Sequence, residues 1–280
     1  MKHLSKNPLA LACAAFLALL GVAAILGAAL APHAAGGLHP DQVLLSPGAG
    51  HWFGTDRLGR DLLARSLAGA RVSLVVGLSA TLLAGAIGFF YGALSGLLGG
   101  KTDALLMRLV DAFYGLPDLL LVILLSLVLG SGPLPVALAL GLVGWLRIAR
   151  ICRGEVLRIK AQAFYESALA LGTGFWRRLF RCVLPNLSGP LLVALTLSVP
   201  AAILGESVLS FIGLGINDPY SPWGTSWGTL ARSGWQGLRT YPYLLFFPSA
   251  AIFLTTLAFN LLGDFLRDVL DPTSGPSRRV

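Results

Sequence analysis

Few residues in this chain could do chemistry, and none of them forms a recognisable catalytic or metal-binding pattern. The three cysteines, Cys13, Cys152 and Cys182, show neither C-x-x-C spacing nor the histidine spacing of a zinc site. The sequence also lacks the H-E-x-x-H and G-x-S-x-G patterns of metalloproteases and serine hydrolases. We therefore expect no enzyme, no resident metal and no disulfide framework.

The closest approach to a nucleotide-binding motif is the run from Ser95 to Thr102. A phosphate-binding loop has glycine where Ser95 stands, and it joins a strand to a helix. Here the run ends a long apolar segment. We therefore expect no ATP and no other cofactor on this chain.

Two acids, Asp111 and Glu206, stand out because they fall inside long apolar runs. A charge within a membrane is costly, so such a group faces the protein interior or water. Arg108 precedes Asp111 by three residues, which is close enough on a helix for the two to pair. For each acid, a structural role and a role in a polar pathway both stay open.

The composition indicates a membrane protein. Of the 280 residues, 55% are hydrophobic and only 12% are charged, whereas an average soluble domain carries about 25% charged residues. The net charge of +8 could suggest nucleic acid, but the basic residues are not clustered with aromatic residues as in such proteins. We expect no nucleic-acid partner.

Six apolar runs come near the roughly 20 residues that a helix needs to cross a bilayer. They are Pro8–Leu30, Ser73–Leu98, Ala104–Leu129, Leu134–Ile151, Leu187–Phe211 and Tyr243–Leu266. The first could be a signal peptide cleaved in the Ala-rich sequence near Ala34. Its apolar stretch exceeds the usual 7 to 15 residues, roughly, and this favours a retained helix. Arg147 and Arg150, at the end of the fourth run, are expected to reach the lipid headgroups.

The six runs predict an all-α polytopic membrane protein with about six transmembrane helices, surrounded by lipid. With both termini in the cytosol, most of the 21 Lys and Arg residues lie in or beside cytosolic segments. This asymmetry follows the positive-inside rule.

Glycine recurs every fourth residue at Gly88, Gly92, Gly96 and Gly100. On a helix these positions form a smooth stripe, which predicts close packing against another helix. Pro117 lies inside the third apolar run and can bend its helix, because proline removes a backbone donor.

The segment from Arg147 to Pro185 is a long basic loop. Gly154–Leu171 reads as an amphipathic helix, which Gly172 can end because glycine tolerates the left-handed conformation. Thr173 can cap a second helix over Gly174–Val183. The pair could lie on lipid headgroups or project into the cytosol as a docking element.

Within this loop, Glu166-Ser-Ala168, Gly172 and Leu184-Pro185 resemble the E-A-A-x3-G-x9-I-x-L-P pattern of ABC importer permeases. The sequence departs from that pattern at Ser167 and Cys182. In the family, this loop sits in a cleft of an ATPase subunit. The resemblance therefore implies an ATPase-docking segment formed by Glu166, Ser167, Ala168, Leu169, Ala170, Leu171, Gly172 and Thr173.

Other segments resemble the "C"-type permease of the dipeptide, oligopeptide and nickel subfamily. They are Phe53-Gly-Thr-Asp56, Leu58-Gly-Arg-Asp61, Gly69–Leu74, Glu206–Gly215 and Asn260–Pro272. The expected organisation is an N-terminal helix with a periplasmic segment (1–72), a core permease domain (73–272) containing the coupling loop (152–185), and a cytosolic tail (273–280). The expected fold is that of a type I ABC importer permease.

The resemblance implies a permease subunit that forms half of a pathway for di- or oligopeptides in the bacterial inner (cytoplasmic) membrane. The implied partners are a second homologous permease, two ABC ATPases that carry ATP and Mg, and a periplasmic or lipid-anchored substrate-binding protein. Nickel or metal chelates and glutathione-like solutes are alternative substrates. A self-sufficient channel or secondary carrier is the alternative of a different class.

Overall fold

The computed structural model describes residues 7–30, 36–216 and 224–270, and within these ranges every regular element is a helix. The cytosolic tail 273–280, the Asp271–Pro272 end of the C-terminal signature and the cleavage point near Ala34 lie outside them. The elements are α1 Pro8–Leu30, η2 Pro40–Gln42, α2 Leu62–Leu98, α3 Gly100–Tyr114, α4 Asp118–Leu129, α5 Pro133–Lys160, α6 Ala163–Ala170, α7 Phe175–Arg178, η3 Leu179–Val183, α8 Leu184–Ile212, α9 Trp227–Trp235 and α10 Tyr243–Leu270.

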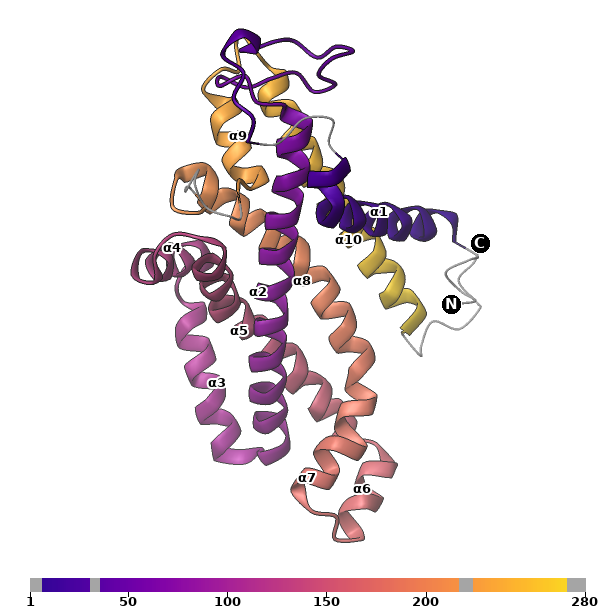
Figure 1. Cartoon of the computed structure of the whole chain (residues 1–280). Coiled ribbons are helices and arrows are strands. Elements are labelled where there is room, and N and C mark those ends of the chain that lie inside the picture. Colours follow the sequence, from indigo (N-terminus) through magenta and orange to yellow (C-terminus); the bar gives the residue numbers. More distant parts are fainter. Residues whose placement is uncertain (1–6, 31–35, 217–223, 271–280) are drawn as a thin grey trace.

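Long helices arranged around α2 form the body of the molecule (Figure 1). The α2–α3 turn and the short helices α6 and α7 lie at one end, and the segment before α2 lies with α9 at the opposite end. Five described helices (α1, α2, α5, the α7–α8 run and α10) are long and apolar enough to cross a membrane. The bent pair α3–α4 would make a sixth, which agrees with the predicted fold class.

The glycine stripe on α2 is the surface on which α5 packs. A Cβ added to Gly92 would lie 2.2 Å from the backbone oxygen of Ala149, and one added to Gly96 would lie 2.8 Å from Cβ of Val156. Gly88 makes an equally close approach to α5. The packing prediction is therefore confirmed for these three positions. Gly100 instead begins α3, with φ at 57° and open space beside it.

The third apolar run, expected as a single span that Pro117 can bend, is sharply bent. It forms α3 and α4, whose axes differ by 86° across a short break. Pro117 is the residue immediately before α4. Its ring and missing N–H disrupt the helical hydrogen bonds, and it also disfavours the α conformation in the residue that precedes it.

The spans also extend further into the basic loop than the sequence indicated. α5 is one 28-residue helix from Pro133 to Lys160, so the predicted helix start at Gly154 was wrong. On the other side, α7, the π-helical segment η3 and α8 form one 38-residue apolar run. Pro185 lies in the first turn of α8 and offers no N–H to the preceding turn, which favours the wider π-helical hydrogen bonding there.

Candidate functional site

A helical hairpin, residues 161–183, stands out from one end of the molecule (Figure 1). α6 ends at Ala170 with Leu171 as its C-cap, and Gly172 follows with a φ of 69°, in the left-handed region. The backbone N–H and hydroxyl of Thr173 both donate to the Ala168 oxygen, at 3.1 Å and 2.6 Å. Thr173 therefore closes α6 and does not cap the next helix as predicted, because Gly174 occupies that capping position.

The hairpin exposes several large apolar side chains among its polar and basic ones. Leu171 is 84% exposed and Trp176 is 66% exposed, and Phe164, Leu169 and Phe180 are also exposed. Exposed large apolar side chains of this kind are typical of a surface that contacts another protein or the membrane. Of the remaining predicted docking residues, Glu166, Ser167, Ala170 and Gly172 are exposed, whereas Ala168 and Thr173 are half-buried.

One side chain ties the hairpin to the spans. Tyr165 of α6 is only 2% exposed, and it packs in a core cluster with Ile159 of α5 and with Leu179 and Val183 of η3. Arg178 also donates a hydrogen bond of 3.3 Å to the Tyr165 hydroxyl. Tyr165 therefore links α6 to the end of α5 and to the η3 segment that leads into α8.

The base of the hairpin is held to α2 and α3 by charged groups. Arg153 of α5 binds both carboxylate oxygens of Asp103 at 2.6 Å, and such bidentate pairs fix geometry as well as charge. Lys160 donates to the Gly96 oxygen at 2.9 Å. These contacts fix the end of α5 to α2 and α3.

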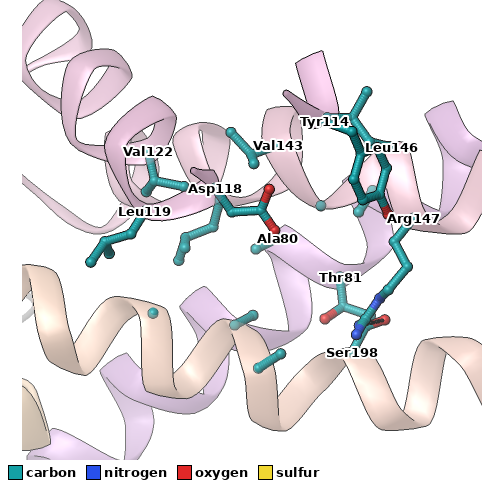
Figure 2. Close-up of a pocket in the computed structure, with 16 residues that line it drawn as sticks. Ala80, Thr81, Tyr114, Asp118, Leu119, Val122, Val143, Leu146, Arg147 and Ser198 are labelled. Carbon is teal, nitrogen blue, oxygen red and sulfur yellow. Dashed lines mark hydrogen bonds between the residues drawn. The ribbon is translucent and has the colours of Figure 1, made fainter. Parts of the chain in front are cut away.

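A cavity of about 290 Å³ lies between α2, α5 and α8, beside the α3–α4 break. Its walls are mostly apolar, but Thr81, Asp118, Arg147 and Ser198 also line it. Figure 2 shows Arg147 reaching from α5 toward Ser198 of α8, with Thr81 beside them and the Asp118 carboxylate turned into the same space. The Arg147 guanidinium donates to the Ser198 hydroxyl at 2.9 Å.

Sequence reasoning missed the charges of this cavity. Asp118 lies inside the predicted third span but was not counted among the intramembrane acids, and Arg147 was assigned to the lipid headgroups. The signal was available, since an aspartate next to Pro117 marks an interrupted span, and ionisable groups at interruptions line cavities.

Asp111 lies outside the cavity lining, and its predicted partner was wrong. Its carboxylate pairs with Arg150 of α5 at 2.6 Å, rather than with Arg108. The Arg150 guanidinium also stacks on the Tyr114 ring, 3.6 Å from its centroid. Asp111 therefore links α3 to α5, which favours the structural reading.

Glu206 is fully buried and does not line the cavity beside the α3–α4 break. Its carboxylate accepts hydrogen bonds from Ser73 of α2 at 3.0 Å and from Ser210 at 2.7 Å. Ser73 in turn accepts from the backbone N–H of Trp227 at the start of α9. A buried carboxylate with such partners joins three helices, so we infer a structural role.

No three His, Cys, Asp or Glu side chains within the described ranges gather in a way that could hold a metal ion. The run from Ser95 to Thr102 joins two helices and does not link a strand to a helix.

Comparison with known proteins identifies the family. Residues 88–274 match the family model described as the binding-protein-dependent transport system inner membrane component. The chain belongs to this family of transport permeases. Residues 1–47 of this permease match the N-terminal membrane domain of oligopeptide transport permease C.

Three relatives show how broad the likeness is. The permease is 44% identical over 272 residues to the dipeptide transport system permease of Bacillus subtilis, covering 97% of this chain and 84% of the relative. It is 45% identical over 226 residues to the oligopeptide transport system permease of the same bacterium, covering 81% and 73%. It is 38% identical over 232 residues to the glutathione transport system permease of Pectobacterium atrosepticum, covering 83% and 76%.

The family membership confirms the main expectations drawn from the sequence. The protein is a multi-pass inner-membrane permease of the ABC importer class and not an enzyme. Because the family belongs to binding-protein-dependent transport systems, the alternative hypothesis of a self-sufficient channel or secondary carrier is wrong.

Proposed function

We propose that this permease forms half of the translocation pathway of an ATP-driven importer for di- or oligopeptides. In this proposal an ATPase subunit docks on residues 166–173. The observation that carries the docking role is the exposed apolar tip of a hairpin whose two ends continue directly into α5 and α8. A tip built in this way can both bind a partner and transmit its movement.

The mechanical link runs from the tip to the cavity. α5 carries Arg147 and α8 carries Ser198, so the two helices that hold the hairpin also line the cavity. Movement of the tip would change the spacing between these helices. Because a ligand shifts an equilibrium only through different affinities for its two states, ATP binding to the partner must favour one spacing over the other.

The charge distribution supports an orientation with the hairpin and both termini in the cytosol. Arg177, Arg178 and Arg181 lie on the hairpin, and Lys101 lies beside the α2–α3 turn at the same end of the molecule. Basic residues concentrate on the cytosolic side of membrane proteins.

A second permease, a second ATPase and a substrate-binding protein complete the proposed assembly, with ATP and Mg on the ATPase subunits. Tyr114, Asp118 and Arg147 line the cavity yet are exposed in this chain alone. Since charged groups within a membrane face protein or water, another chain is needed to enclose this side.

The peptide assignment rests on what the relatives are named for. Dipeptide and oligopeptide permeases are the two relatives at 44% and 45% identity. The glutathione permease is 38% identical to this chain, and a glutathione-like solute is therefore the second candidate substrate. Nickel and metal chelates are the third.

Disulfide cross-linking to a co-expressed ATPase subunit tests the docking role. Cys182 is partly exposed, so the experiment uses a Cys182→Ser background, whereas Cys13 and Cys152 are buried. Leu171→Cys is a better probe than a cysteine at half-buried Ala168. Val128→Cys, equally exposed on α4, is the matched control.

The proposal expects Leu171→Cys to cross-link to cysteines placed along the ATPase cleft and Val128→Cys not to do so. If cysteines at Glu166, Ala170 and Leu171 all fail to cross-link in the assembled complex, the docking role is wrong.

A further inference from the structure

Two oppositely charged side chains, Asp118 and Arg147, line the cavity beside the α3–α4 break without forming an ion pair with each other. Asp118 has no hydrogen-bond or ion-pair partner within the part of the chain that the structure describes. Arg147 is held by the uncharged hydroxyl of Ser198 at 2.9 Å. Both side chains line the same space, so neither charge is neutralised by its opposite within the cavity (Figure 2).

A third polar group faces this space without a partner. Thr81 of α2 is 4% exposed, and its hydroxyl has no hydrogen-bond partner among the described residues. It lines the same cavity as Arg147 and Ser198. An unmade hydrogen bond in a buried place costs free energy, so such a group marks a place where a ligand or water is to be bound.

We propose that this cavity is a transit site for a zwitterionic solute, with Asp118 facing a free ammonium group and Arg147, Ser198 and Thr81 facing a free carboxylate. This inference rests on the proposed function as an importer of small peptides and adds the groups that would select them. Arg147 suits the carboxylate because a guanidinium offers several donors in one plane.

The size and polarity of the cavity are suited to weak, transient binding of a short peptide. Its volume of about 290 Å³ is at the small end of ligand pockets, which span about 300 to 1,000 Å³. Two charged contacts in otherwise apolar walls orient a solute without holding its side chains. A transport pathway needs such binding, because a solute that binds too tightly does not leave.

The elements that carry the two charges also suit a site that opens and closes. Arg147 lies on α5, which continues toward the hairpin, whereas Asp118 lies at the first residue of α4, beyond the break. A shift of α5 would therefore change the distance between the two charges. The carboxylate and ammonium contacts would then be made together in one state and separated in the other.

The test compares uptake of alanyl-alanine, N-acetyl-alanyl-alanine and alanyl-alanine amide by the complete importer in proteoliposomes. Each permease variant is measured with the same binding protein. Because that protein is unchanged, any change in the uptake ratio between two of these substrates comes from the permease.

Asp118→Asn is expected to lower the preference for the free amine over the acetylated peptide. Arg147→Gln is expected to lower the preference for the free carboxylate over the amide. Each change should be about tenfold, as expected for loss of a hydrogen bond between charged groups. Arg147→Lys keeps the charge and should retain much of the preference, and Thr81→Val should affect only the carboxylate preference.

Arg108→Gln and Asp264→Asn are matched controls, because both side chains are exposed and lie outside the cavity lining. Both should keep the parental ratios. If Asp118→Asn and Arg147→Gln also keep them while the parent imports the dipeptide, the transit site is wrong and the importer assignment stands. If the assembled parent imports none of the three peptides, the peptide assignment and the site both fail.

Discussion

Gly59 occupies a turn that has no room for a side chain. Its φ is 71°, and an added Cβ would lie 1.8 Å from the backbone oxygen of His39. Gly59→Ala should therefore lower the stability of the purified permease by at least about 2 kcal/mol, since it adds a clash to left-handed strain. Thermal unfolding in detergent measures this change. Gly50→Ala, with open space around it, is the control and should leave the midpoint unchanged.

Asp56 gives the segment before α2 a dependence on pH. Burial alone would raise the pKa of Asp56, but the guanidinium of Arg65 and the backbone N–H groups of Arg60 and Leu58 outweigh it, so the pKa lies below its ordinary 3.8. A carboxyl with a lowered pKa stabilises the fold above its unfolded-state value and loses that effect as the pH falls through the folded pKa. The stabilisation should therefore be complete at pH 7 and decline below about pH 4.

Thermal unfolding measured from pH 7 to pH 3 tests this pH dependence. Asp56→Asn should lower the unfolding midpoint at pH 7, and the difference from the parent should shrink toward pH 3. A difference that stays constant over this range would show that the Asp56 charge does not contribute.

At the scale of single residues, the sequence motifs indicate the protein family but do not explain why each residue is needed. The segments Phe53-Gly-Thr-Asp56 and Leu58-Gly-Arg-Asp61 indicate the family by their resemblance to it. Their physical roles depend on partners outside the pattern, such as His39 against Gly59 and Arg65 against Asp56. A motif read by itself does not reveal which distant residue fills the space beside it.

Among the elements, the α2–α5 pair shows sequence prediction at its best. Gly92→Ala should separate the two helices, because the added methyl would lie 2.2 Å from the Ala149 oxygen on α5. We expect lower stability and reduced uptake, with a loss of about 2 kcal/mol or more as in other overpacked contacts. Gly154→Ala on α5, where an added Cβ meets no atom within 4 Å, should be neutral or slightly stabilising. Equal effects of the two substitutions would contradict the packing account.

The α3–α4 break shows where local pattern fails. Pro117 predicted a bend, but nothing local to the sequence gave its size of 86°. The bend lets α4 pack on α5, and Val122 of α4 lies in a core cluster with Val136 and Ala139 of α5. Tertiary packing decides such angles, and for the same reason the place of Asp118 in the cavity was missed.

At the scale of the whole molecule, the same two helices, α5 and α8, connect the proposed docking tip to the cavity. The sequence predicted the tip through Glu166, Gly172 and Pro185, and the left-handed Gly172 is confirmed. It did not predict that α5 and α8 run unbroken from the hairpin to Arg147 and Ser198. In the proposed function, this continuity would let a docked partner transmit its movement to the cavity.

The most direct test of this coupling is the ratio of peptide uptake to ATP hydrolysis in proteoliposomes for two variants of one residue. Gly172→Val puts a β-branched residue at φ 69°, whereas Gly172→Asn puts there the non-glycine residue that best tolerates this conformation. An added Cβ meets no other atom within 4 Å, so neither variant introduces a clash at Cβ within this chain. The left-handed penalty of about 1–2 kcal/mol would reduce the correctly folded tip about tenfold.

We predict that Gly172→Val loses most uptake per ATP hydrolysed, whereas Gly172→Asn keeps a ratio close to that of the parent. An unchanged ratio in Gly172→Val, with the complex fully assembled, would contradict the proposal that this hairpin couples the ATPase to the pathway.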